Sequence, residues 1–228
     1  MGAIAAALQA VHARIAAACA EAGRDPATVQ LLAVSKTHPA DAIRAAFAAG
    51  QRAFGESYVQ EALAKQAALA DLEIEWHYIG PLQRNKTRAV AEHFAWVHGI
   101  DRLDLAERLS RQRPESLPPL QVCVQVNVGG ETSKRGVPPD AAVALARQVA
   151  GLPRLKLRGF MTIPPPSDAP ATQRGYFRVL AALLHQARAE GLDVDTLSMG
   201  MSQDLESAIA EGATIIRVGT AIFGARQG

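Results

Sequence analysis

A lysine at the end of a short apolar run is the first group in this chain that could do covalent chemistry. Residues 31–34 are apolar, Lys36 follows them, and a helix-patterned segment begins after Pro39. Such a run is typical of a buried strand in a βα unit, and α/β folds bind ligands at the carboxyl ends of their strands. A partly desolvated amine there can be neutral and condense with an aldehyde to a Schiff base. Taken alone, the run favours a solvated strand-end lysine, so the assignment depends on the rest of the chain.

Two stretches near the end of the chain have the composition of phosphate-binding loops. Residues 198–204 (SMGMSQD) join an apolar run to a helical pattern, and Ser202 is placed as the N-cap of that helix. Free amides and the helix dipole at such an end attract an anion. Residues 217–220 (RVGT) close the last apolar run, where Gly219 allows close approach of the backbone and Thr220 offers an amide and a hydroxyl. Ordinary capping explains either loop alone, but the pair beside a strand-end lysine favours a phosphate site.

Arg217 adds a positive charge to the second of these loops. A guanidinium donates hydrogen bonds and accepts none. A heteroaromatic nitrogen that faced Arg217 would therefore have to accept, and would be unprotonated. The alternative is a salt bridge between Arg217 and a neighbouring carboxylate.

Strands and helices alternate along the whole chain. The pattern predicts strands at residues 31–36, 52–55, 74–79, 94–97, 120–128, 155–163, 196–199 and 214–218. It predicts helices at residues 4–22, 41–49, 56–69, 84–92, 102–112, 140–150, 172–190 and 202–210. This alternation argues for a parallel sheet with right-handed crossovers. We expect a single α/β domain over residues 1–228, a closed (β/α)8 TIM barrel with an extra N-terminal helix; an open, doubly wound sheet is the alternative.

The predicted strand ends bring several polar or flexible residues to one end of such a barrel. Besides Lys36 and Arg217 they include His77, Asn127 and Met199. Because the carboxyl ends of parallel strands meet at one end of a barrel, we expect these residues to converge there.

The composition argues against several classes of function. The net charge of the 228 residues is only +2 and 5% are aromatic, which argues against nucleic acid as a partner. Cys19 and Cys123 lie far apart without metal-ligand spacing, so we expect no metal site and a reducing compartment. No basic segment precedes the first apolar stretch, and no apolar run reaches the roughly 18 residues of a membrane span. We expect a monomeric cytoplasmic protein.

Long motifs in this chain resemble those of one known family. They are residues 33–37 (AVSKT), 54–61 (FGESYVQE), 77–86 (HYIGPLQRNK), 198–204 (SMGMSQD) and 217–224 (RVGTAIFG). In this order they are similar to the YggS/PROSC family of pyridoxal phosphate homeostasis proteins, over about residues 29–223. The resemblance implies a barrel like the N-terminal domain of alanine racemase.

The resemblance also implies a cofactor and the residues that bind it. It implies pyridoxal 5'-phosphate held as an internal aldimine on Lys36. Ser202, Gly219 and Thr220 match the phosphate-binding pattern, and Arg217 matches the arginine near the pyridine nitrogen. His77, Asn85 and Met199 are the further cofactor-binding residues that we expect from it. Asn127, Glu131, Lys134 and Gly136 match a family signature after the fifth strand.

Two positions depart from the family pattern. Ser57 stands where the family usually has Asn, and its hydroxyl has a shorter reach. His38 stands where many members have Lys. The sequence therefore shows no second lysine next to Lys36.

Arg217 and the extent of the chain favour a binding protein over an enzyme. Pyridoxal phosphate catalysis on amino acids needs an electron-withdrawing ring and a positioned base. Arg217 would weaken the first, and residues 1–228 leave no length for the second domain that supplies a tyrosine in alanine racemases. We expect no catalytic residue, and a role in buffering the cofactor and delivering it to apoenzymes. The alternatives are a pyridoxal phosphate-dependent racemase or lyase, and a phosphosugar aldolase that uses a lysine Schiff base.

Overall fold

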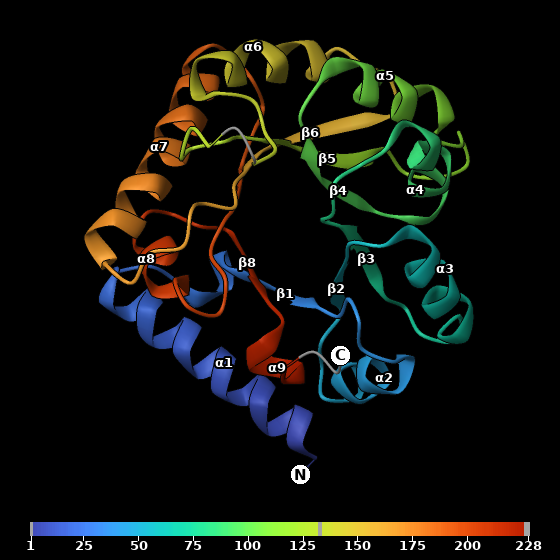
Figure 1. Ribbon diagram of the computed structural model, residues 1–228, viewed down its shortest axis with the longest axis vertical. Helices are drawn as coiled ribbons and strands as arrows, with labels where there is room; N and C mark the ends of the chain where they lie inside the picture. The colour runs from blue at the N-terminus through green and yellow to red at the C-terminus, as the bar shows by residue number, and fades with distance from the viewer. Residues whose placement is uncertain (1, 132–133, 226–228) are drawn as a thin grey trace.

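The computed structural model describes residues 2–131 and 134–225, and its eight parallel strands close into a barrel. The strands follow chain order around the barrel, and β1 pairs with β8 to close it. Helices surround the strands when the molecule is viewed as in Figure 1. The predicted barrel is confirmed, and the alternative of an open, doubly wound sheet is wrong because the first and last strands pair.

The bounds of the elements are as follows. The strands are β1 (Gln30–Val34), β2 (Ala53–Glu56), β3 (Glu75–Tyr78), β4 (Trp96–Ile100), β5 (Leu120–Gln125), β6 (Leu155–Met161), β7 (Thr196–Ser198) and β8 (Ile215–Val218). The α-helices are α1 (Ala3–Glu21), α2 (Ala40–Ala48), α3 (Val59–Ala68), α4 (Thr87–His93), α5 (Leu103–Gln112), α6 (Pro139–Ala150), α7 (Pro170–Ala189), α8 (Leu205–Ala210) and α9 (Thr220–Phe223). Two 3-10 turns, η1 (Pro26–Thr28) and η2 (Arg84–Lys86), precede β1 and α4.

Four differences from the predicted elements affect the site. β1 ends at Val34, so Lys36 lies two residues beyond the strand. β4 runs to Ile100 instead of ending at residue 97. α8 begins at Leu205 instead of residue 202, and the short α9 follows β8 without having been predicted.

Two hydrophobic clusters build the molecule. The larger one lies between the barrel and its helices and includes Phe54, Phe160 and Phe177. The smaller one includes Leu32 of β1, Trp96 of β4 and Met161 of β6. Side chains that alternate along each strand thus fill both layers, as expected for a barrel of this size.

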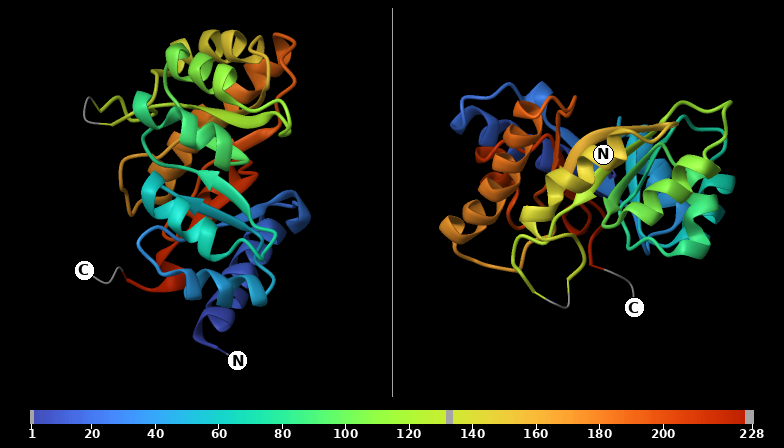
Figure 2. Two further views of the ribbon diagram at one scale, coloured as in Figure 1. Left: turned by 90° about the vertical axis from the view of Figure 1, so that its right-hand side faces the viewer. Right: turned by 90° about the horizontal axis from the view of Figure 1, so that it is seen from above.

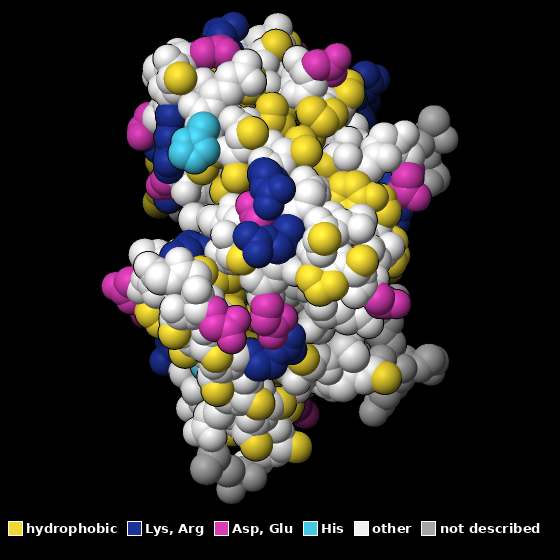
Figure 3. All heavy atoms as spheres, turned by 90° about the vertical axis from the view of Figure 1, so that its left-hand side faces the viewer, with side chains coloured by type: hydrophobic (Ala, Val, Ile, Leu, Met, Phe, Trp, Pro, Cys, Tyr) yellow, Lys and Arg dark blue, Asp and Glu magenta, His cyan; other side chains and the backbone are white. Residues whose placement is uncertain are grey.

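α1 packs against α2, α8 and α9 on the outside of the barrel. Its length and composition would suit a membrane span, but it buries Leu8, Val11 and Ile15 against the rest of the fold. Arg14 on its outer side forms an ion pair with Glu206 of α8. Figure 3 shows that charged side chains of both signs lie interspersed on this face, so it forms no patch of one sign.

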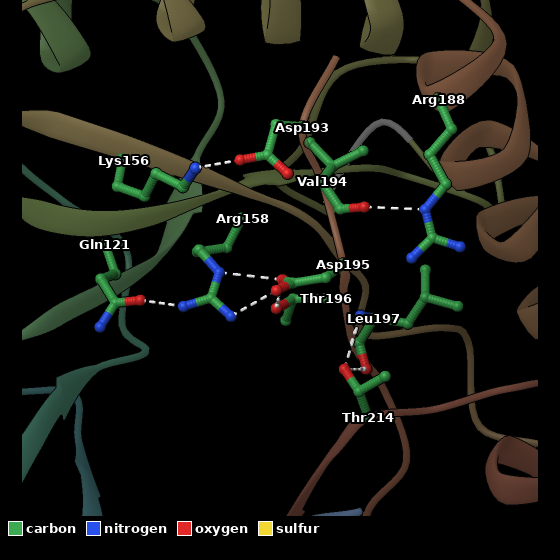
Figure 4. A network of polar contacts seen from close by, with 10 residues as sticks. All are labelled: Gln121, Lys156, Arg158, Arg188, Asp193, Val194, Asp195, Thr196, Leu197 and Thr214. Carbon is green, nitrogen blue, oxygen red and sulfur yellow. Dashed lines mark hydrogen bonds and ion pairs between the residues drawn. The ribbon is translucent and has the colours of Figure 1, made fainter. Parts of the chain in front are cut away.

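Ion pairs join the strands at the amino-terminal end of the barrel. Arg158 of β6 donates to Gln121 of β5 and to both carboxylate oxygens of Asp195 before β7 (Figure 4). The amide of Leu197 donates to the hydroxyl of Thr214 at 2.9 Å, and Arg188 of α7 donates to the backbone oxygen of Val194. A pocket of about 230 Å3 opens here, at the end of the barrel opposite Lys36.

The loops that follow β5 and β6 project together from the other end, on the same side as α9 (Figure 2). They touch one another: a Cβ added to Gly129 would lie 2.4 Å from the ring of Pro165. These loops and those after β1, β7 and β8 therefore surround the carboxyl-terminal mouth, where barrels of this type bind ligands.

Candidate functional site

The seam between the first and last strands brings Lys36 to the loop after β8. A Cβ added to Gly219 would lie 3.1 Å from the backbone oxygen of Val34, so a larger residue here would press on the end of β1. The ring of His38 stacks on Phe223 of α9 with 5.1 Å between centroids. Contacts on both sides of Lys36 thus hold its turn against Gly219 and Thr220.

The loop after β7 meets the same place from the other side. The amide of Arg217 donates to the backbone oxygen of Gly200 at 3.0 Å. Gly200 has a φ of +94°, and a Cβ there would lie 2.6 Å from the Cβ of Ala208. The two loops predicted to bind phosphate are therefore neighbours.

Unpartnered amides line both loops. The backbone N–H groups of Ser202, Gln203, Thr220 and Ala221 meet no acceptor among the residues that the structure describes. Ser202 itself is half-buried, but it is not the N-cap that we predicted: Asp204 holds that position, and its carboxylate accepts from the amide of Met201. The prediction failed because Ser202 and Gln203 form a turn ahead of α8. The free amides of this loop therefore belong to a turn rather than to the start of the helix.

Arg217 is almost fully buried at the mouth of the barrel. One terminal nitrogen donates to the hydroxyl of Ser198 and the other to the backbone oxygen of Thr162, both at 2.8 Å. Burial lowers the pKa of Arg217 to about 10, which leaves it charged at neutral pH. No carboxylate forms a salt bridge with it within residues 2–131 and 134–225, although the charge of Asp204 acts to raise its pKa.

A buried ion-pair group supports the turn that carries Lys36. The ammonium of Lys65 donates to the carboxylates of Glu56 and Glu61 and to the backbone oxygen of Ser35. Glu61 also accepts from the amide of Thr37, which has a φ of +67°. A threonine in this left-handed conformation is strained. The hydrogen bond from its backbone N–H to Glu61 offsets part of that strain.

Lys65 is the second lysine near Lys36 that the sequence did not reveal. It comes from α3, and it is held by two carboxylates rather than free to react. Burial raises the pKa of Glu56, while its contacts with Lys65 and Ser35 act to lower it. Lys65, Glu56 and Ser35 thus hold the turn of Lys36 in place.

His77 lies deeper in the barrel than we predicted. Its ring stacks on Trp96, and its nitrogens lie 2.9 Å from His98 Nε2 and 2.6 Å from a Glu75 oxygen. Both nitrogens are therefore engaged by the protein inside the barrel. His98, which we did not identify from the sequence, continues this polar chain toward Ser198 at 2.7 Å.

The remaining predicted residues have different surroundings. The side chain of Met199 packs in the core between barrel and helices, and Asn85 is exposed in the turn η2 after β3. Asn127 donates to the backbone oxygen of Glu131. Gly136 has a φ of +115°, and a Cβ added to it would lie 2.7 Å from the backbone nitrogen of Asn127. The signature after β5 thus shapes the loop around Asn127.

Ser57 lies where its backbone packs on Gly80, since a Cβ on Gly80 would come within 2.4 Å of the Ser57 oxygen.

Comparisons with known proteins agree with this barrel. The family model described as "Alanine racemase, N-terminal domain" matches residues 7–227. The pyridoxal phosphate homeostasis protein of Pseudomonas aeruginosa is 61% identical over 217 residues, which cover 95% of this chain and 93% of that protein. The structure of PipY from Synechococcus elongatus with pyridoxal phosphate bound has a TM-score of 0.82 and 44% identity, and covers 92% of this chain and all of that one.

Alanine racemase itself shares only the fold. The enzyme from Corynebacterium glutamicum has a TM-score of 0.71 at 19% identity, and the match covers 98% of this chain but 61% of that chain. The fold and the mouth of the barrel define an alanine racemase N-terminal-type barrel. Within that class, this chain belongs to the family of pyridoxal phosphate homeostasis proteins.

Proposed function

We propose that this protein binds pyridoxal phosphate at the carboxyl-terminal mouth of the barrel and takes part in intracellular pyridoxal phosphate homeostasis. The observation that supports this most directly is the seam between β1 and β8, where the turn of Lys36 packs against Gly219 and the loop of Arg217. The homeostasis names of relatives and the ligand in the PipY structure support the choice of cofactor.

The residues at this mouth fit the three functional groups of that cofactor. Lys36 supplies an amine for the aldehyde, and the free amides of Ser202 and Thr220 suit the phosphate. Gly219 keeps the backbone open beside them, and Arg217 supplies a charged donor for the pyridine nitrogen. Asn85, Met199 and His77 stay predictions from the family resemblance. The side chains of Met199 and His77 are enclosed by other parts of the protein, so we do not propose that they contact the cofactor.

The same residues favour holding the cofactor over turning over amino acids. When bound, pyridoxal phosphate supplies a reactive aldehyde and a ring that withdraws electrons most strongly when its nitrogen is protonated. A charged Arg217 next to that nitrogen opposes its protonation. We infer a non-catalytic role in buffering and delivery, in a monomeric cytoplasmic protein that passes the cofactor to apoenzymes.

The test is an absorbance spectrum of the purified protein with pyridoxal phosphate, before and after borohydride. We expect a yellow protein, and after reduction the mass of the cofactor fixed on the peptide that contains Lys36. Lys36→Ala should abolish the label, while Lys36→Arg tests whether charge without a reactive amine is sufficient. A label on Lys65, Lys86 or Lys134 would refute the assignment.

A further inference from the structure

A continuous chain of polar side chains crosses the barrel interior from one end toward the other. It runs from Glu75 through His77, His98 and Ser198 to Arg217, and it uses strands β3, β4, β7 and β8. The successive distances are 2.6, 2.9, 2.7 and 2.8 Å. All but Glu75 are fully or almost fully buried.

The chemistry of the two ends sets the direction of the first and last hydrogen bonds. Arg217 can only donate, so the Ser198 oxygen accepts from it. At the other end the carboxylate of Glu75 can only accept, because the contact with His77 lowers its pKa and keeps it ionised. His77 Nε2 must therefore hold a proton.

The positions of the remaining protons follow from the neutral charge state of both histidine rings. Burial lowers the pKa of both histidines, and Arg217 and His77 lower that of His98 further, while Glu75 acts to raise that of His77. With its proton on Nε2, neutral His77 accepts at Nδ1 from Nε2–H of His98. Nδ1 of His98 then accepts from the hydroxyl of Ser198, so one consistent assignment satisfies all five groups.

We propose that Ser198 and His98, supported by His77 and Glu75, are positioning residues that hold the Arg217 guanidinium toward the pyridine nitrogen of the bound cofactor. This inference rests on the proposed function. The hydroxyl of Ser198 fixes one terminal nitrogen of Arg217, and the oxygen of Thr162 fixes the other. Because Ser198 gives its proton to His98, its lone pairs remain directed at Arg217.

The chain also places a negative charge at a distance from the cofactor. Glu75 is 39% exposed at the amino-terminal end, where it also accepts from Gln30 at 3.2 Å. A carboxylate in direct contact would neutralise Arg217 and favour a protonated ring. Polarised hydrogen bonds instead orient Arg217 while it keeps its charge.

The experiment compares two ligands that differ only at the ring nitrogen. Binding constants are measured for pyridoxal phosphate and for its 1-deaza analogue, in which C–H replaces that nitrogen. Ser198→Ala and His98→Leu should weaken pyridoxal phosphate about tenfold or more, which is the effect expected for a misaligned charge-assisted hydrogen bond. Binding of the deaza analogue should change less than about twofold, because it makes no such bond.

Matched variants separate positioning from packing. His98→Asn places an amide oxygen near the position of Nδ1, so it keeps an acceptor for Ser198 and should retain most of the affinity. His98→Leu removes that acceptor at comparable size. If His98→Leu fails to fold, Ser198→Ala decides the question, since it removes a single oxygen. Equal weakening of both ligands, or no weakening of either, would overturn the proposal.

A second measurement does not depend on the cofactor. In ligand-free protein labelled with 15N-histidine, both buried rings should appear as neutral Nε2–H tautomers at pH 7. The opposite tautomer or a charged ring would contradict the hydrogen-bond directions assigned from Glu75 to Arg217. Failure of the wild-type protein to bind either ligand would instead refute the proposed function. The histidine spectra would still decide whether the hydrogen-bond network from Glu75 to Arg217 has the assigned directions.

Discussion

The ammonium of Lys65 donates a 2.8 Å hydrogen bond to the backbone oxygen of Ser35, the residue that precedes Lys36. This bond comes from α3, and the two carboxylates that flank Lys65 are fully buried Glu56 and part-exposed Glu61. The turn that carries Lys36 is therefore fixed by a contact from α3.

Removing Lys65 should destabilise the protein more than its contact area suggests. Lys65→Met leaves Glu56 buried without its cation, and loss of one partner of a buried pair costs about 3–5 kcal/mol. The double variant Lys65→Met with Glu56→Gln should recover part of this loss, because the charge is then absent. The free energy of unfolding from urea titration measures both. Arg44→Met, which breaks the exposed pair with Asp71, is the control and should change little.

The phosphate prediction concerns the two loops with free amides. Ser202→Ala together with Thr220→Val removes the two hydroxyls beside those amides. This double variant should weaken pyridoxal phosphate but leave unphosphorylated pyridoxal nearly unchanged. Hydrogen bonds to a charged group contribute about 1.5–3 kcal/mol each, which is roughly 10-fold to 150-fold in affinity. Titration by absorbance measures both ligands. Thr28→Val, at the opposite end of the barrel, is the control, and an equal loss for both ligands would place the phosphate elsewhere.

The non-catalytic role predicts slow chemistry at the α-carbon of bound amino acids. Exchange of the α-proton of alanine and serine in deuterated water should be well below about 1 per second, a modest enzyme rate. Arg217→Glu should favour a protonated ring and speed the exchange, at some cost in cofactor affinity. NMR follows both proteins. Wild-type exchange at ordinary enzyme rates would show that the chain is a racemase-like enzyme.

Acid should destabilise the fold through the two buried histidines. Burial lowers the pKa of His77 and His98, so both remain neutral in the folded protein near pH 6.5, their ordinary pKa. Below that pH the unfolded chain binds more protons, so the free energy of unfolding decreases as the pH falls from 7.5 to 5.5. The largest decrease in the free energy of unfolding is about 1.4 kcal/mol per histidine for each pH unit below 6.5.

Urea titrations at several pH values check this prediction. His98→Asn should remove about half of the decrease, since one titrating ring is gone. His185→Asn, on the exposed side of α7, is the matched control and should leave the slope as in the wild-type protein. A flat profile between pH 7.5 and 5.5 would contradict neutral buried rings.

Local patterns in the sequence predicted the barrel and the seam of the site. Alternating apolar runs and helical segments determine a parallel barrel, and Lys36, Gly219 and Thr220 stand at strand ends that such a barrel must bring together. The supporting residues were not predictable in the same way. The contact of Lys65 with Ser35 depends on how α3 packs on the barrel, which no local pattern encodes.

His98 was missed for a different reason. We ended the fourth strand at residue 97 because the apolar run stopped there, yet Trp96, His98 and Ile100 continue one strand. A buried polar residue inside a strand breaks the hydrophobic signal even where the alternation persists. Ser202 illustrates the reverse error, since a good capping residue sits two positions before the actual N-cap, Asp204.

The seam between β1 and β8 has a consequence for how this protein is made. Translation adds Lys36 well before Arg217, so the nascent chain holds Lys36 before it holds the loops after β7 and β8. Closure of the sheet by β8 is also the contact most distant in sequence, and such contacts form slowly. A bound ligand would contact the loops after both β1 and β8, so cofactor binding would require a closed barrel. Binding would also slow the reopening of the barrel.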